Sequence, residues 1–144
     1  MRAWFIAVLL LVTACIQEEV TPEGVLKTFI EARLGKVITR QFVLDRVTGK
    51  MRASLEGMSE EDFIKFADLR NVKRDSFKVL SKSCQEKRCF LTYAIAYQTK
   101  TEAHFFSEVK KIAELQLIDG KWLIADVSNV KTYHEALEAI NPLE

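Results

Sequence analysis

Cys15 is the first of three cysteines in the 144-residue chain and stands at the end of a short apolar segment. A positive charge at Arg2 begins the chain, and the uncharged apolar residues 4–12 follow it. A basic start, a short apolar run and small residues before a cleavage point form the layout of a secretory signal. The run is too short to cross a bilayer, which needs about 20 apolar residues. The sequence therefore predicts export, with processing at the cysteine.

The stretch LVTAC at residues 11–15 resembles a bacterial lipobox. In lipoproteins of this kind the cysteine becomes the first mature residue and carries a thioether-linked diacylglycerol. Several acyl chains on one residue exceed the marginal membrane affinity of a single chain. We therefore expect residues 1–14 to be a lipoprotein signal peptide, 15–21 a lipidated tether, and 22–144 one domain. Lipoproteins that many two-membrane bacteria retain in the inner membrane carry Asp directly after the cysteine, where this chain has Ile16. The resemblance therefore implies the outer membrane facing the periplasm, or the cell surface in a one-membrane bacterium.

Cys84 and Cys89 flank a polar loop of four residues between two strand-like runs. Exported cysteines tend to oxidise, and a hairpin brings residues on its two strands close together. Free thiols and a metal pair are the alternatives, although no third or fourth metal ligand stands nearby in the sequence. The sequence predicts a disulfide at the hairpin, and neither a metal nor a cofactor.

Four side chains are candidates for lining a pocket. Tyr93 and Tyr97 lie four residues apart on one predicted strand face, and Trp122 and Asp126 lie on one face of a later strand. The alternative for the tyrosines is a sheet face packed on helices. For Asp126 the alternative is a carboxylate at the end of a strand that caps the next loop.

His104 and His134 are the two histidines of the chain. We expect His104 to face solvent at the start of a strand and His134 to lie in a terminal helix. Zinc-protease, phosphate-loop and nucleophile-elbow motifs are absent from the sequence. No residue is therefore assigned a catalytic role.

The elements that must position these residues begin with helices. Thr21 followed by Pro22 and an acid predicts a helix start, and the apolar stripe that follows runs to Gly35. Apolar spacing indicates a second helical stretch over 42–49, with a further turn or two over 51–55. Ser59, followed by acids, resembles a capping box and predicts the next start.

From about residue 75 the apolar period becomes two, which is typical of strands. Asp119-Gly120 predicts a hairpin turn. The expected elements are strands near 77–79, over 90–97, 105–117 and 121–127, and a terminal helix over 133–140. Helices followed by consecutive hairpins predict an α+β fold with helices packed on an antiparallel sheet of about four long meander strands.

The order of these elements and the segment LIDGKWLIADV at 117–127 resemble the small secreted-lipoprotein branch of the NTF2-like superfamily, over about residues 21–130. The resemblance implies a curved sheet whose concave face receives the helices, so that the domain forms a cone. The hairpin motif also occurs in unrelated folds, and a cystatin-like arrangement of sheet on helix is the alternative.

Fold alone does not decide function, because the superfamily hosts isomerases, dehydratases and non-enzymatic domains. We expect a non-enzymatic domain at the cell envelope that binds a protein partner or a small apolar ligand, or that assembles as a homodimer. The alternative is an enzyme of the isomerase or dehydratase type with its active site in the cone. An open cone with converging Tyr, His and Asp side chains would favour chemistry, and a cone filled by Phe and Leu would favour a scaffold.

The charges of the chain balance, with 21 Lys and Arg against 20 Asp and Glu. This balance removes the positive field on which nucleic-acid binding depends, so that partner class is not expected. A modest basic stretch is predicted to be a solvated face, with lipid headgroup contact as the lesser alternative; it comprises Lys73, Arg74, Lys78 and Lys82, with Lys110, Lys111 and Lys121.

The lipid anchor has a direct test in the substitution Cys15→Ser. Without the thiol no thioether can form, so we expect labelling with radioactive palmitate to be lost and the protein to leave the membrane fraction. A variant that still takes up palmitate and still sediments with membranes would contradict the lipobox assignment.

Overall fold

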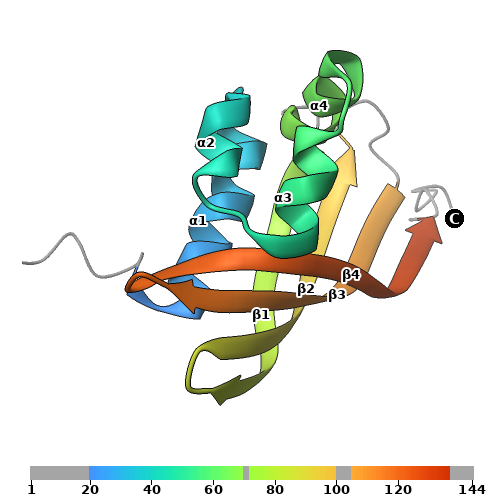
Figure 1. Ribbon diagram of the computed structural model, residues 1–144. Helices are drawn as coiled ribbons and strands as arrows, with labels where there is room; N and C mark the ends of the chain where they lie inside the picture. Colours follow the sequence, from blue (N-terminus) through green and yellow to red (C-terminus); the bar gives the residue numbers. More distant parts are fainter. Residues whose placement is uncertain (1–19, 70–71, 100–104, 137–144) are drawn as a thin grey trace, which may run out of the picture.

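The computed structural model describes residues 20–69, 72–99 and 105–136, and shows helices followed by a four-stranded sheet (Figure 1). The helices are α1 (Pro22–Gly35), α2 (Arg40–Leu44), α3 (Gly49–Glu56) and α4 (Glu60–Ala67). The strands are β1 (Val72–Gln85), β2 (Arg88–Thr99), β3 (Phe105–Ile118) and β4 (Lys121–Ala136). This α+β order confirms the predicted fold class. The expected signal peptide, Cys15 and most of the tether lie outside the described residues, in which no helix is long and apolar enough to cross a membrane.

Two helix starts follow from their capping side chains. The Thr21 hydroxyl accepts a hydrogen bond of 3.1 Å from the backbone N–H of Gly24, and Pro22 is the first helical residue. The Ser59 hydroxyl accepts from the N–H of Asp62 at 3.1 Å and donates to its carboxylate at 2.7 Å. Both sequence predictions are confirmed, because each cap satisfies N–H groups that the first helical turn leaves free.

The middle helices differ from the prediction. Instead of ending a second helix, Gly49 begins α3, with a left-handed φ of 54°. The chain before it leaves the helical conformation because Val47 forms a parallel bridge with Ile124 on β4. The Thr48 N–H donates to the Ile124 carbonyl, and the Ile124 N–H donates to the Arg46 carbonyl, both at 2.9 Å. This pairing attaches the α2–α3 connection to the edge of the sheet.

The sheet is an antiparallel meander in the order β1-β2-β3-β4. The predicted turn between β3 and β4 is confirmed, with left-handed φ angles of 49° at Asp119 and 77° at Gly120. The turn between β1 and β2 is tighter than the four-residue loop expected. Gln85 already pairs with Arg88, so only two residues connect the strands.

β4 is longer than predicted and runs to Ala136, where it pairs with Phe105 at the start of β3. The expected terminal helix is therefore wrong over residues 133–136, and its remainder, 137–140, lies outside the described part of the chain. The backbone of β3 offers a ladder to the N–H and C=O groups on the side of β4 that faces it along this stretch. Such tertiary pairing overrides the local helix propensity.

Two bulges in β1 change which of its residues face the helices. The register shifts between Arg74 and Ser76 and again further along the strand, and each extra residue reverses the alternation of faces. As a result Arg74 forms an ion pair of 2.9 Å with Glu31, and Lys82 one of 2.7 Å with Glu23, both on α1. Lys82 remains exposed to solvent, as predicted for the basic stretch, whereas Arg74 is half-buried against α1. Their ion pairs fasten the two ends of α1 to β1.

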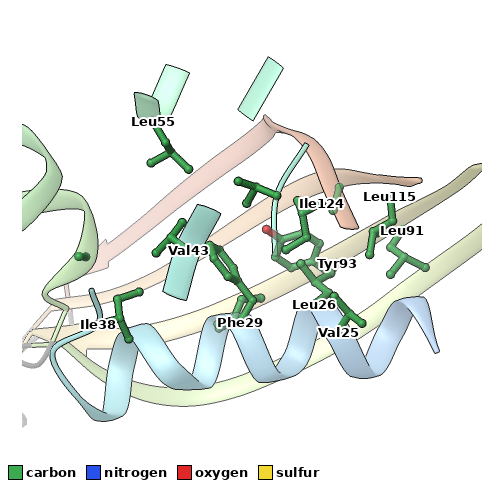
Figure 2. Packing of buried hydrophobic residues seen from close by; sticks show 14 of the residues in the cluster. Val25, Leu26, Phe29, Ile38, Val43, Leu55, Leu91, Tyr93, Leu115 and Ile124 are labelled. Atoms are coloured by element: carbon green, nitrogen blue, oxygen red, sulfur yellow. The ribbon is translucent and has the colours of Figure 1, made fainter. Parts of the chain in front are cut away.

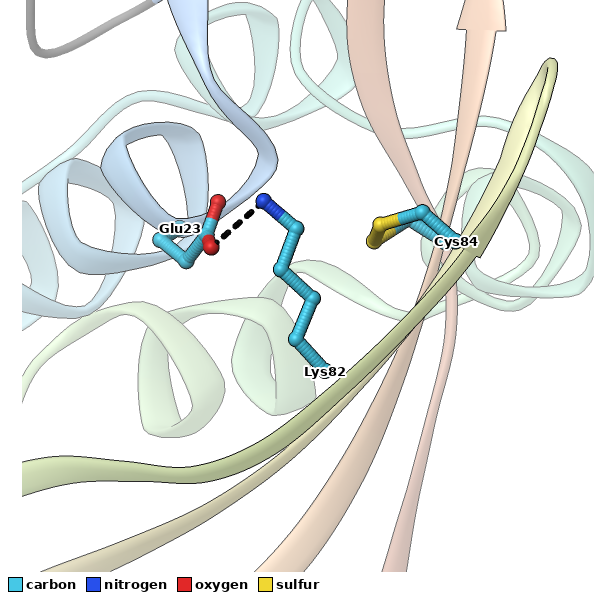
Figure 3. The surroundings of a disulfide bond; sticks show 4 residues. Glu23, Lys82 and Cys84 are labelled. Carbon is cyan, nitrogen blue, oxygen red and sulfur yellow. Dashed lines mark ion pairs between the residues drawn. A yellow bond between two sulfur atoms is a disulfide. The ribbon is translucent and has the colours of Figure 1, made fainter.

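The sulfur atoms of Cys84 and Cys89 lie at disulfide distance, as predicted (Figure 3). The two residues are direct partners in the β1–β2 register, and their Cα atoms are 4.0 Å apart. Cys89 is fully buried, whereas Cys84 is exposed. The bridge lies beside the Glu23–Lys82 ion pair, at the end of the sheet that carries this hairpin.

The core forms where α1 packs on the concave face of the sheet (Figure 2). Its largest fully buried aliphatic side chains are Leu26, Val43, Val47, Leu55, Leu91, Leu115 and Ile124. Among the described residues, every member of the core, including the partly buried ones packed around it, lies within residues 25–127. A chain that begins at Ile16 therefore keeps all of these core residues.

Leu91 and Phe90 test the register of β2 as a matched pair of neighbours. Leu91 is fully buried, whereas Phe90 is 41% exposed on the opposite face. We expect Leu91→Ala to lower the free energy of unfolding by about 2–5 kcal/mol, because it opens a cavity in the core. Phe90→Ala should cost on the order of 0.5–1 kcal/mol. Urea unfolding measures both values, and equal costs would contradict the register.

Candidate functional site

A cavity of about 710 Å³ lies between the helices and the concave face of the sheet. This is within the range of pockets that hold a small organic molecule, roughly 300–1,000 Å³. Most of its wall is apolar and comes from α1, α3, α4 and the sheet. The polar wall residues are Arg33, Lys50, Ser54, Tyr93, Tyr97, Lys111, Asp126, Asn129 and Thr132.

The cavity occupies only part of the cone, because side chains fill the end near the disulfide. Successive registers across β2, β3 and β4 show where the filling stops. The two filled rows are Cys89–Leu115–Ile124 and Leu91–Ala113–Val127, in which all residues are fully buried except Val127, which already lines the cavity. The next rows, Tyr93–Lys111–Asn129 and Ile95–Val109–Thr132, line the cavity. The cone is therefore closed at one end and hollow towards the other.

A polar row marks the boundary between the filled and the hollow parts. Tyr93, Lys111 and Asn129 are neighbours across three strands, and each lines the cavity. The Tyr93 ring is only 3% exposed and lies among Leu26, Phe29 and Ile124 in Figure 2. Three potential donors therefore lie side by side on a floor that is otherwise apolar.

Arg33 on α1 supplies a second positive charge to the wall. Its Nε and Nη2 atoms donate to the Phe66 carbonyl oxygen at 3.1 and 2.6 Å. The guanidinium carbon also lies 4.0 Å from the centroid of the Phe66 ring, a cation–π distance. These contacts hold Arg33 in place and join α1 to α4.

Burial shifts the pKa of each ionisable group around the polar row. It lowers the pKa of Arg33 to about 10, and it raises the pKa of Tyr93 to about 12 against the opposing effect of the Arg33 charge. Burial lowers the pKa of Lys111 as well, and the nearby Arg33 charge lowers it further. Two cations thus share a poorly hydrated space and repel each other.

Lys111 has neither a hydrogen-bond partner nor an ion-pair partner in the part of the chain that the structure describes. By contrast, Lys50 at the rim has its Nζ 3.9 Å from a carboxylate oxygen of Asp126, and both side chains are open to solvent. A half-buried cation without a counter-charge is costly. It is the most unusual electrostatic feature of the site.

The structure places three of the four predicted pocket residues in the cavity wall: Tyr93, Tyr97 and Asp126. Trp122 lies elsewhere, opposite Leu117 and packed against the core. The register of β4 shifts after Ile124, and the extra residue at this bulge removes Asp126 from the face that Trp122 and Ile124 share. Asp126 lies instead beside Lys50 of α3, at the rim of the cavity.

The structure describes the backbone of only one of the two histidines. His104 lies outside the described residues, and His134 stands opposite Ser107 in β4 rather than in a helix. Asp126 is the one acid among the described wall residues. Over the described ranges there is also no cluster of three His, Cys, Asp or Glu residues that could hold a metal ion.

Arg33 was not singled out from the sequence, and Lys111 was named only in the basic stretch predicted to be a solvated face, which is wrong at this residue because it lines the cavity. Each of the two charges breaks an apolar pattern. Arg33 continues the helical spacing of Leu26, Phe29 and Ile30 by one further turn. Lys111 stands between Val109 and Ala113 in the alternation of β3. A charge at a position that the period assigns to the interior is the signal that could have identified both.

Comparison of the chain with family models, curated proteins and solved structures finds no match.

Lys111→Met tests whether the lysine costs stability in the folded protein. Methionine keeps most of the side-chain length and removes the charge, so we expect the free energy of unfolding to rise by about 0.5–2 kcal/mol. Lys110→Met is the matched control, because Lys110 occupies the other face of β3, outside the cavity wall, and should change stability little. Thermal or urea unfolding gives both values. A destabilised Lys111→Met variant would show that the ammonium has a compensating partner.

Proposed function

We propose that this chain is a bacterial envelope lipoprotein whose NTF2-like domain binds a small apolar ligand in the hollow part of its cone and does no catalysis. The observation that carries the proposal is the largely apolar cavity of about 710 Å³ above a closed core. A cone meant only as a scaffold would be filled along its whole length, as it is around Leu91 and Leu115. Burying apolar ligand surface in such a space is favourable.

The chemistry of the wall favours binding over acid–base catalysis. An isomerase-type site needs a carboxylate base inside the cavity. The acid of the described wall, Asp126, instead lies at the rim, is open to solvent and pairs with Lys50. With a pKa of about 12, Tyr93 stays protonated at neutral pH and acts as a hydrogen-bond donor.

The predicted anchor would keep the binding domain near the bilayer. Six residues, 16–21, separate the lipid-bearing cysteine from the first helix. Fully extended, they reach about 20 Å. A short tether of this kind suits a protein that exchanges an apolar molecule with a membrane or with a neighbour in the envelope.

The neutral dye N-phenyl-1-naphthylamine, which fluoresces strongly in apolar surroundings, tests the cavity. We expect the chain beginning at Ile16 to bind it saturably, with about one site per chain. Ile95→Trp places a large ring in the cavity and should weaken binding by at least about tenfold, equivalent to about 1.4 kcal/mol. Ala94→Trp, on the opposite face of β2, is the matched control and should leave binding unchanged.

Absence of saturable dye binding by the folded chain would overturn the proposed function. Equal loss of binding in the Ile95 and Ala94 variants would place the dye outside the cavity. Circular dichroism of all three proteins establishes that each is folded before the comparison is made.

A further inference from the structure

We infer that the ligand of this cavity is an amphiphilic anion, with an apolar body and one carboxylate head group that lies between Lys111 and Arg33. The inference rests on the proposed function and specifies its ligand class. A fatty acid is the simplest molecule of this chemistry. Its head would meet the polar row, and its chain would lie along the apolar wall towards the open end.

The charges of the wall call for an anion. Its charged residues in the described part of the chain are Arg33, Lys50, Lys111 and Asp126. Lys50 and Asp126 lie close to each other at the rim and offset one another. This leaves two positive charges, Arg33 and Lys111, in the poorly hydrated interior. A single carboxylate between them would relieve their mutual repulsion and supply the counter-charge that Lys111 lacks.

Unused hydrogen-bond donors point to the same head group. The Lys111 ammonium has three N–H donors and no described partner. Two Arg33 donors share one acceptor, the Phe66 carbonyl, so further guanidinium N–H groups remain available. A carboxylate is an acceptor only, with about four lone-pair sites, which matches a wall rich in donors. A neutral alcohol would leave most of these donors without partners.

The apolar part of the wall fits the remainder of such a ligand. Ile95 and Val109 form the register row next to Tyr93 and Lys111, on the side away from the filled core. Met51 on α3 and Met58 in the connection between α3 and α4 also line the cavity. Methionine side chains are flexible and adapt to unbranched chains. Each methylene buried there contributes about 0.8 kcal/mol.

Displacement of the bound dye by three ten-carbon amphiphiles tests the inference at neutral pH. These are decanoate, decan-1-ol and decyltrimethylammonium, which differ in the charge of the head. We expect decanoate to displace N-phenyl-1-naphthylamine at a concentration at least about tenfold lower than decan-1-ol, and the cation to be the weakest competitor.

Variants at β3 then locate the head group. Lys111→Met should reduce the preference for decanoate over decan-1-ol to near one while decan-1-ol still displaces the dye. Lys111→Arg should keep the preference because it keeps the charge, and so should Lys110→Met on the opposite face. Persistence of the preference in Lys111→Met would overturn the assignment of the head to this lysine.

The results separate the inference from the function on which it rests. If the folded chain binds the dye but decanoate competes no better than decan-1-ol or the cation, the anionic ligand is refuted and a binding cavity for apolar ligands stands. If the folded chain binds no dye, the proposed function itself fails.

Discussion

The difference in length between the helices and the strands governs this structure. α1 has 14 residues and is about 21 Å long, whereas β3, also of 14 residues, extends over about 46 Å. α1 alone therefore cannot bury the whole concave face of so long a sheet. Leu26 on α1 and Leu91 and Ile124 on the sheet close the disulfide end completely. The rest of the face stays hollow, and its residues line the cavity.

Arg33 and Lys111 illustrate two uses of a cation in a low-dielectric space. The charge on Arg33 is partly compensated, since its guanidinium stacks on Phe66 and donates to a carbonyl, and these contacts join two helices. Lys111 receives no such compensation within the described chain, so the folded state bears its cost. Proteins tolerate such a cost where function requires it. The electrostatics of the cavity therefore argue for binding rather than for stability.

Much of the fold could be predicted because it is encoded by short-range signals. Thr21 and Ser59 cap helices through contacts with residues three positions away, and the Asp119-Gly120 turn needs only two residues that accept a positive φ. The bulges of β1 and β4 leave no comparable mark, because the partner strand decides where an extra residue is accommodated. The face of Arg74 was therefore mispredicted, and the end of β4 was mistaken for a helix. The same limit applies to the site. Tyr93 and Tyr97 could be predicted as pocket residues because they follow the strand alternation. The roles of Arg33 and Lys111 could not, because they depend on neighbours that are distant in sequence.

The central claim is that the cone is closed at one end and open for an acidic amphiphile at the other. A nuclear magnetic resonance titration with decanoate tests this claim most directly, with the isotope-labelled chain that begins at Ile16. Backbone amide shifts should change mainly at the two hollow rows, around Tyr93, Ile95, Val109, Lys111 and Asn129. The amides of the filled row at Cys89, Leu115 and Ile124 should change little. Shifts confined to the opposite face of the sheet, or absent from the residues around Lys111, would contradict the assignment of the cavity as the binding site.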